Sequence, residues 1–203
     1  MYQIMRVFSA GLVVLNTLLP VTLPTASYAS NPRQEQTGGA VVTGLESSCG
    51  GVILLENGVF SIPTGWCFQR STMVPKSENY VLTFSARSLD GDGYGVWLRG
   101  AWNESNTQAF AVQYEAAPGG NSSQRRIIFL RYPATESPIN VATQRDLDRK
   151  YHAWRIVGSK NMVQFFLDGK LIGSYNEPAS GNDFGFRTWR GRVEVKNLKI
   201  SEH

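Results

Sequence analysis

The stretch that decides the fold is the run Asp183-Phe-Gly-Phe-Arg-Thr-Trp-Arg-Gly-Arg-Val-Glu-Val-Lys-Asn-Leu-Lys-Ile200 near the C-terminus. Its alternation predicts two β-strands on either side of a turn at 190–192, because successive strand side chains point to opposite faces. One face of the first strand carries Phe184, Phe186 and Thr188, and the other carries Gly185, Arg187 and Trp189. The same alternation on the second strand groups Val193, Val195 and Asn197.

A sheet with one buried face would turn the two phenylalanines inward and leave Arg187 and Trp189 side by side on the outside. This pair suits a sugar, because an aromatic ring packs against the C–H face of a pyranose while a guanidinium donates to its hydroxyls. We therefore expect the rest of the chain to form the scaffold of such a surface.

Strand-like alternation recurs through the chain, and no helical period is found. The further predicted strands cover 52–55, 59–62, 80–87, 94–99, 109–115, 126–132, 151–157, 162–167 and 170–175. Asn57-Gly58 and Asp168-Gly169 predict hairpin turns between consecutive strands. Many short strands joined by such turns predict an all-β fold, a two-sheet antiparallel sandwich of the jelly-roll type.

The N-terminus has the pattern of an export signal. A start with the single charge Arg6, an apolar run over 7–19 and the small residues before Ala29 predict a signal peptide at 1–29. An uncleaved membrane anchor is disfavoured, because Asn16 and Pro20 interrupt an apolar run shorter than the roughly 20 residues of a span. We expect a flexible leader at 30–48, the sandwich domain at 49–203, and a secreted protein, extracellular or periplasmic, with no membrane segment after cleavage.

Charge and cysteine content narrow the possible functions. The formal net charge is +4, and acids and bases are mixed along the chain without a basic stripe. Nucleic acid is therefore not an expected partner. The two cysteines, Cys49 and Cys67, both lie in the exported part, which predicts one disulfide worth about 3 kcal/mol.

Several segments, taken in order, resemble the concanavalin A-like lectin/glucanase superfamily. They are Tyr94–Arg99, Tyr151–Val157, Val163–Lys170, Phe184–Trp189 and Val195–Ile200. Within that superfamily the chain is similar to the laminin-G-like branch that holds three-keto-disaccharide hydrolases and fructan-binding carbohydrate modules. The resemblance implies two stacked antiparallel sheets, a saccharide on the outer face of one sheet, and first and last strands that are neighbours. The paired glutamates of the glucanases are missing, so the resemblance gives no catalytic site.

Strict alternation predicts one binding face. Trp97 and Arg99 would share a face, as would Gln113 and Glu115 on the next strand, while Trp102 would form a rim. The expected carbohydrate-binding residues are Trp97, Arg99, Gln113, Glu115, Arg187 and Trp189. The alternative is a solvated surface with cross-strand Arg–Glu pairs, and an inverted alternation would put Trp97 in the core.

These observations predict a secreted, non-catalytic carbohydrate-binding protein, expected to be a monomer, whose partner is a polysaccharide or glycan. The first alternative is a small glycoside hydrolase with Glu115 as acid or base, partnered by Glu104, Asp183 or Glu177. The second is an extracellular protein-interaction module of the laminin-G type. Trp154 is expected in the core, and His152 is expected to be structural rather than catalytic.

No cofactor is expected to be required. Asp90-Gly-Asp-Gly93 is expected to be a turn, because it lacks the later carboxylate of an EF-hand loop. The resemblance to laminin-G-like modules leaves a structural calcium ion open as an alternative.

Overall fold

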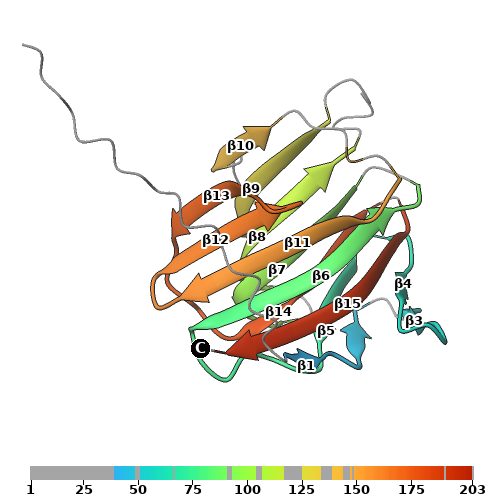
Figure 1. The fold of residues 1–203 in the computed structure, drawn as a ribbon, viewed down its shortest axis with the longest axis horizontal. Coiled ribbons are helices and arrows are strands. Elements are labelled where there is room, and N and C mark those ends of the chain that lie inside the picture. Colours follow the sequence, from blue (N-terminus) through green and yellow to red (C-terminus); the bar gives the residue numbers. More distant parts are fainter. Residues whose placement is uncertain are drawn as a thin grey trace, which may run out of the picture. The chain divides into compact units, whose positions relative to one another are not determined.

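Antiparallel β-strands make up the regular structure (Figure 1). The computed structural model describes residues 39–48, 51–65, 67–90, 93–103, 107–116, 125–133, 139–143, 147, 149–189 and 191–202. No helix occurs among them, which confirms the all-β prediction. The described residues belong to one unit that spans 37–203.

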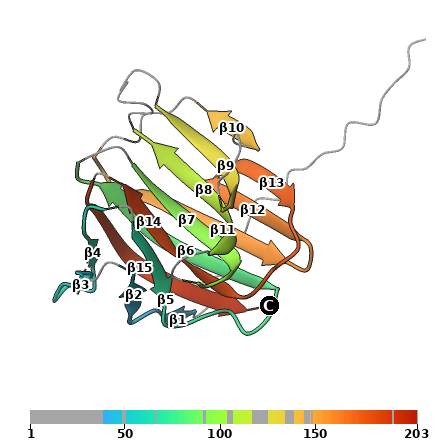
Figure 2. The same cartoon turned by 180° about the vertical axis from the view of Figure 1, so that it is seen from behind.

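The strands form two antiparallel sheets, stacked as Figures 1 and 2 show from opposite sides. The eight-stranded sheet has the order β13-β12-β11-β6-β15-β4-β3, with β1 added beside β15. Its strands are β1 (Ala40–Val41), β3 (Ile53–Leu54), β4 (Phe60–Ile62), β6 (Tyr80–Ser88), β11 (His152–Ser159), β12 (Met162–Leu167), β13 (Lys170–Asn176) and β15 (Val193–Glu202). The seven-stranded sheet has the order β10-β9-β8-β7-β14-β5-β2. Its strands are β2 (Leu45–Ser47), β5 (Cys67–Ser71), β7 (Gly93–Ala101), β8 (Gln108–Glu115), β9 (Arg126–Tyr132), β10 (Asn140–Thr143) and β14 (Asp183–Trp189).

The core lies between the sheets and is aromatic. Phe84 of β6 meets Phe186 of β14 edge to face, with ring centroids 5.3 Å apart. Trp154 of β11 donates from Nε1 to the hydroxyl of Tyr94 on β7 at 3.0 Å, which joins the two sheets. Trp154 is therefore a core residue, as the sequence predicts.

The two closing strands do not pair with each other. β14 lies between β7 and β5 in one sheet, whereas β15 lies beside β6, β4 and β1 in the other. The turn between β14 and β15 therefore passes from sheet to sheet. Phe184, Phe186 and Thr188 face the interior as predicted.

The predicted alternation of β15 is wrong at Asn197. This residue has a φ of 56° and is exposed, and the register with β6 shifts between Lys196 and Lys199. The resulting bulge moves the inward positions to Leu198 and Ile200, which are buried.

Order begins earlier than the sequence suggests. β1 and β2 lie within the predicted leader 30–48, so the described part of that range, 39–48, contains strands and is not a flexible leader. β1 pairs with the last strand, with Ala40 opposite Ile200, as the resemblance implies. The predicted signal peptide at 1–29 lies outside the described residues and stays a prediction. The described part contains no helix long and apolar enough to span a membrane.

Candidate functional site

The outer face of the seven-stranded sheet carries a second apolar cluster, separate from the core. We call it the outer cluster. Its buried members are Trp97, Ala109, Ala111, Ile128, Leu130 and Tyr132, and Phe68 and Trp102 pack against them. An aromatic cluster on the face turned away from the core is unusual for a sheet with a solvated side, and marks this face as a candidate for ligand binding.

Trp97 is the floor of the outer cluster. Its Nε1 donates to the carbonyl oxygens of Gln69 and Phe186, both at 3.1 Å, so the indole reaches across β14 toward β5. Only glycine fits beneath it at position 185, where a Cβ would lie 1.7 Å from the Gln69 oxygen. Trp102 stacks on the indole, and Trp97 is 0% exposed. Trp97 therefore lies on the predicted face, but the prediction that it is an exposed plate is wrong.

Arg187 lies among the aromatic rings of the same face. Its Nη1 donates to the Tyr132 hydroxyl at 2.6 Å, and its guanidinium carbon lies 4.9 Å from the ring centroids of Phe68 and Tyr132. Burial raises the pKa of Tyr132, an effect partly offset by Arg187. The hydroxyl therefore stays protonated, and its hydrogen meets no acceptor among the described residues.

Gln113 lies next to Arg187 across a gap made by Gly95. In the register, Gly95 of β7 is opposite Arg187 on one side and Gln113 on the other. A Cβ at position 95 would lie 2.9 Å from Gln113 Cγ, so the glutamine side chain leans over the glycine. Gln113 is only 5% exposed, and its Nε2 has no hydrogen-bond acceptor in the described part of the chain. Such a buried donor costs free energy unless a ligand or water satisfies it.

Glu115 and Trp189 lie one step further along the same face. Both are opposite Gly93 of β7, from β8 and β14 respectively. Glu115 Oε2 accepts from Arg126 Nε at 2.6 Å, while Oε1 meets no donor among the residues described. Trp189 is 7% exposed, so the predicted open indole is wrong here too. The structure thus brings five of the six predicted residues to one face.

Arg99 is the exception. It has a φ of 54°, and a register shift between Leu98 and Ala101 marks a bulge that breaks the alternation. Its guanidinium donates to the carbonyls of Ser159, Lys160 and Met162 at the β11–β12 turn of the other sheet. The prediction that Arg99 shares the face of Trp97 is therefore wrong, and the residue ties the two sheets together.

Two residues of this face were absent from the sequence prediction. Phe68 lies on β5, for which no strand was predicted, and its ring centroid is 5.1 Å from that of Tyr132. Tyr132 ends β9, a predicted strand to which the sequence assigned no site residue. Polar–aromatic alternation over Phe68-Gln69-Arg70 is the only local signal for Phe68.

No family model matches the chain, and no curated relative matches it. Solved structures do. A carbohydrate-binding module, CBM66 from Bacillus subtilis, superposes with a TM-score of 0.61 at 16% identity, covering 79% of this chain and 97% of that one. The exoplasmic/lumenal domain of VIP36, solved bound to Ca²⁺ and Man3GlcNAc, gives 0.58 at 11% identity, with 78% and 85% covered. The alginate lyase AlgAT5 of polysaccharide lyase family 7 gives 0.52 at 14%, with 75% and 82% covered.

This is a concanavalin A-like fold. Identities this low show the fold alone, and the fold hosts binding and catalysis alike. The function of this concanavalin A-like sandwich therefore depends on the side chains of its candidate site.

Acidic partners for Glu115 are not found in the described part of this concanavalin A-like sandwich. Asp183 is opposite Gly100 of β7, seven positions from Gly93, or about 23 Å along the strand. It accepts from Arg70 and from the Trp102 amide, while Glu177 pairs with Arg131. Glycosidases hold their two carboxyl groups about 5 to 9.5 Å apart. Glu104 lies outside the described residues.

Three further predictions concern His152, a possible calcium site at 90–93 and the disulfide. His152 Nδ1 lies 2.9 Å from Asp168 Oδ2, and Asp168 Oδ1 accepts from the Ala153 amide, so the histidine helps to hold a turn. Asp90 accepts from the Arg192 amide at 2.7 Å, but residues 91 and 92 lie outside the description, and calcium binding there stays untested. The disulfide also stays a prediction, because Cys49 and the Cys67 side chain lie outside it.

Proposed function

We propose that this protein is an exported, non-catalytic carbohydrate-binding protein whose sugar lies on the outer face of the seven-stranded sheet. The observation that carries the proposal is the combination, on one face, of an aromatic cluster with polar atoms that have hydrogen-bonding capacity left over among the described residues. The groups are the Tyr132 hydroxyl hydrogen, Gln113 Nε2 and Glu115 Oε1. Export rests on the predicted signal peptide.

The chemistry of this face matches a sugar better than other small ligands. Two donors and one acceptor can hold hydroxyl pairs, since each hydroxyl both donates and accepts. Trp102, which is half-buried at the rim, offers a ring for the C–H face of the sugar. Arg126 balances the charge of Glu115, so this pair does not favour an ionic ligand. The known binding of carbohydrate by CBM66 and of a mannose-containing glycan by VIP36 supports the class of ligand, on the same fold.

Isothermal titration calorimetry against fructans, β-glucans, galactans and mannans tests the proposal. Tyr132→Phe keeps the ring and removes the hydroxyl, and Gln113→Ala removes the amide. We expect each substitution to lower the affinity for the sugar about five- to tenfold, the usual effect of losing one hydrogen bond. Leu171→Ala, an exposed position on β13 of the other sheet, is the matched control and should bind like the wild type. Wild-type affinity in both site variants would overturn the assignment of this face.

Catalysis is tested separately by reducing-sugar release from the same polysaccharides. A non-catalytic binder releases none. Release that Glu115→Gln abolishes would replace the proposal with the glycoside-hydrolase alternative, whereas capture of a protein that free sugars do not displace would favour the interaction-module alternative.

A further inference from the structure

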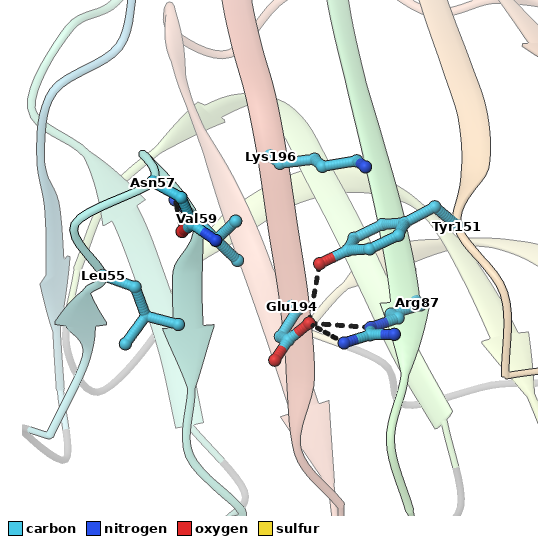
Figure 3. Close-up of a pocket in the computed structure, with 7 residues that line it drawn as sticks. All are labelled: Leu55, Asn57, Val59, Arg87, Tyr151, Glu194 and Lys196. Atoms are coloured by element: carbon cyan, nitrogen blue, oxygen red, sulfur yellow. Dashed lines mark hydrogen bonds and ion pairs between the residues drawn. The ribbon is translucent and has the colours of Figure 1, made fainter.

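A hollow lies on the outer face of the eight-stranded sheet, away from the outer cluster of the other sheet. Its volume is about 420 Å³ (Figure 3). Adjacent strands build it, because Glu194 of β15 is opposite Arg87 of β6 on one side and Ser61 of β4 on the other. Tyr151 and Lys196 complete the polar wall, and Leu55, Asn57 and Val59 form the facing wall. None of these residues belongs to the site on the seven-stranded sheet.

Glu194 is held as a carboxylate in this hollow. Its Oε2 accepts from Arg87 Nε at 2.7 Å and from the Tyr151 hydroxyl at 2.6 Å. These bonds, that from Tyr151 foremost, lower the pKa of Glu194 below its ordinary value. All the described donors go to Oε2, and Oε1 is left as an acceptor on the side of the hollow (Figure 3).

Lys196 supplies a positive charge that no described carboxylate balances. Its Nζ lies 3.8 Å from the Tyr151 ring centroid, and the guanidinium carbon of Arg87 lies 4.6 Å from the same ring. Figure 3 shows the ring between these two cations. Arg87 is neutralised by Glu194, but Lys196 forms no ion pair with any described carboxylate. The polar wall therefore keeps one net positive charge.

The facing wall offers both amide and apolar groups. Asn57 Oδ1 accepts from the Val59 amide at 3.3 Å, which leaves the amide hydrogens of Asn57 as donors. Leu55 is exposed beside it and presents an apolar surface. The hollow thus combines an acceptor (Glu194 Oε1), an amide donor (Asn57), an apolar contact (Leu55) and an unbalanced cation (Lys196).

We propose that this hollow binds a uronic-acid residue of an acidic polysaccharide. Lys196 pairs with the sugar carboxylate, Glu194 Oε1 accepts from a sugar hydroxyl, and Asn57 donates to another. A simple anion fits poorly, because the Glu194 carboxylate repels it without gaining a hydroxyl bond. A neutral sugar leaves Lys196 uncompensated. The site does not depend on the proposed function, since it lies on the other sheet.

The test uses the full chain with trigalacturonate, its methyl ester and acetate as probes. Calorimetry should show trigalacturonate binding at least about tenfold more tightly than the ester, which has the same skeleton without the charges. Acetate at the same concentration should bind more weakly still. Two-dimensional ¹H–¹⁵N spectra should shift at the amides of Glu194 and Lys196.

Variants separate this hollow from the other face. Lys196→Met keeps the aliphatic stem and should weaken trigalacturonate about tenfold, so that acid and ester bind alike. Lys199→Met, an exposed lysine on the same strand outside the hollow, and Gln113→Ala on the other sheet should keep wild-type affinity. Circular dichroism and thermal unfolding check the fold of each variant. No acid–ester difference in the wild type, an unchanged difference in Lys196→Met, or equal binding of acetate would overturn the proposal.

Discussion

Trp102 stacks on Trp97 with ring centroids 5.7 Å apart and an angle of 20° between the ring planes. Trp97 is fully buried on the outer face of the seven-stranded sheet, while Trp102 is half-buried above it. The sequence predicts that Trp97 is the exposed ring of the binding face, but in the structure two tryptophans share this work. Trp97 holds the strands together through its bonds to Gln69 and Phe186, and Trp102 is the ring that a ligand can meet.

Replacing Trp102 should therefore affect binding more than folding. We expect Trp102→Ala to weaken sugar binding about tenfold and to cost about 1 kcal/mol of stability, the typical contribution of an aromatic pair. Trp97 should become exposed, so its emission should shift to longer wavelength. Trp102→Phe should retain most of the affinity. Unchanged affinity in Trp102→Ala would exclude the stack from the site.

Arg99 should behave in the opposite way. Its guanidinium satisfies three carbonyls at the β11–β12 turn, and the side chain is buried. Arg99→Met leaves these carbonyls without their charged donor, so we expect a loss of about 3 kcal/mol in the free energy of unfolding. Affinity for the sugar should stay at the wild-type value under native conditions.

Urea unfolding measures the first effect and calorimetry the second. Arg99→Lys is the informative companion, because an ammonium cannot reach three carbonyls with the geometry of a guanidinium, and should recover only part of the stability. A stable Arg99→Met that no longer binds sugar would contradict the structural role and restore the residue to the binding face.

The contrast between Arg187 and Arg99 shows what the sequence could predict. Period-two alternation is reliable within an unbroken strand, and it placed Phe186 inward and Arg187 outward. It fails across a bulge, because one extra residue inverts every later position. Arg99 and Asn197 both adopt a positive φ without being glycine. Asparagine tolerates this conformation, but an arginine in the middle of a strand gives no signal of a bulge.

The local sequence pattern also could not predict which sheet a strand joins or how exposed a side chain is. β14 and β15 follow each other in sequence and look like a hairpin, yet they belong to different sheets, which only long-range pairing decides. Trp97 and Trp189 face outward but are buried, because exposure depends on what packs above a side chain and not on its parity. The hollow at Glu194 combines residues of β6, β15 and the β3–β4 turn, which no sequence spacing relates.

The sequence predicts a disulfide between Cys49 and Cys67, the two cysteines of the chain. β5 begins at Cys67 and pairs with β2, which ends at Ser47. We expect the exported protein to have an intact mass lower by two hydrogens than its reduced form. Reduction should lower stability by about 3 kcal/mol. Free thiols detected in the unfolded, unreduced protein would contradict the bond.

The lowered pKa of Glu194 predicts a pH-dependent contribution to stability. Tyr151 and Arg87 stabilise the carboxylate in the folded protein, so the folded pKa lies below the ordinary value of 4.5. The unfolded chain therefore binds the proton first as pH falls. The stabilisation is fully present above about pH 5 and is lost as the pH falls through the folded pKa.

Glu194→Gln removes the stabilisation by the carboxylate. It should unfold at lower urea concentration than the wild type at pH 7, and the difference should shrink as the pH falls through the folded pKa. Glu78→Gln, which changes an exposed acid with no ion pair in the described part of the chain, is the matched control and should show no such pH-dependent difference. The Glu194 side chain is mostly buried, so its ion pair with Arg87 is only partly screened by salt. Added salt should therefore reduce the pH-dependent difference only in part. A Glu194→Gln difference that is the same at every pH would mean that the side chain contributes by packing and hydrogen bonding alone.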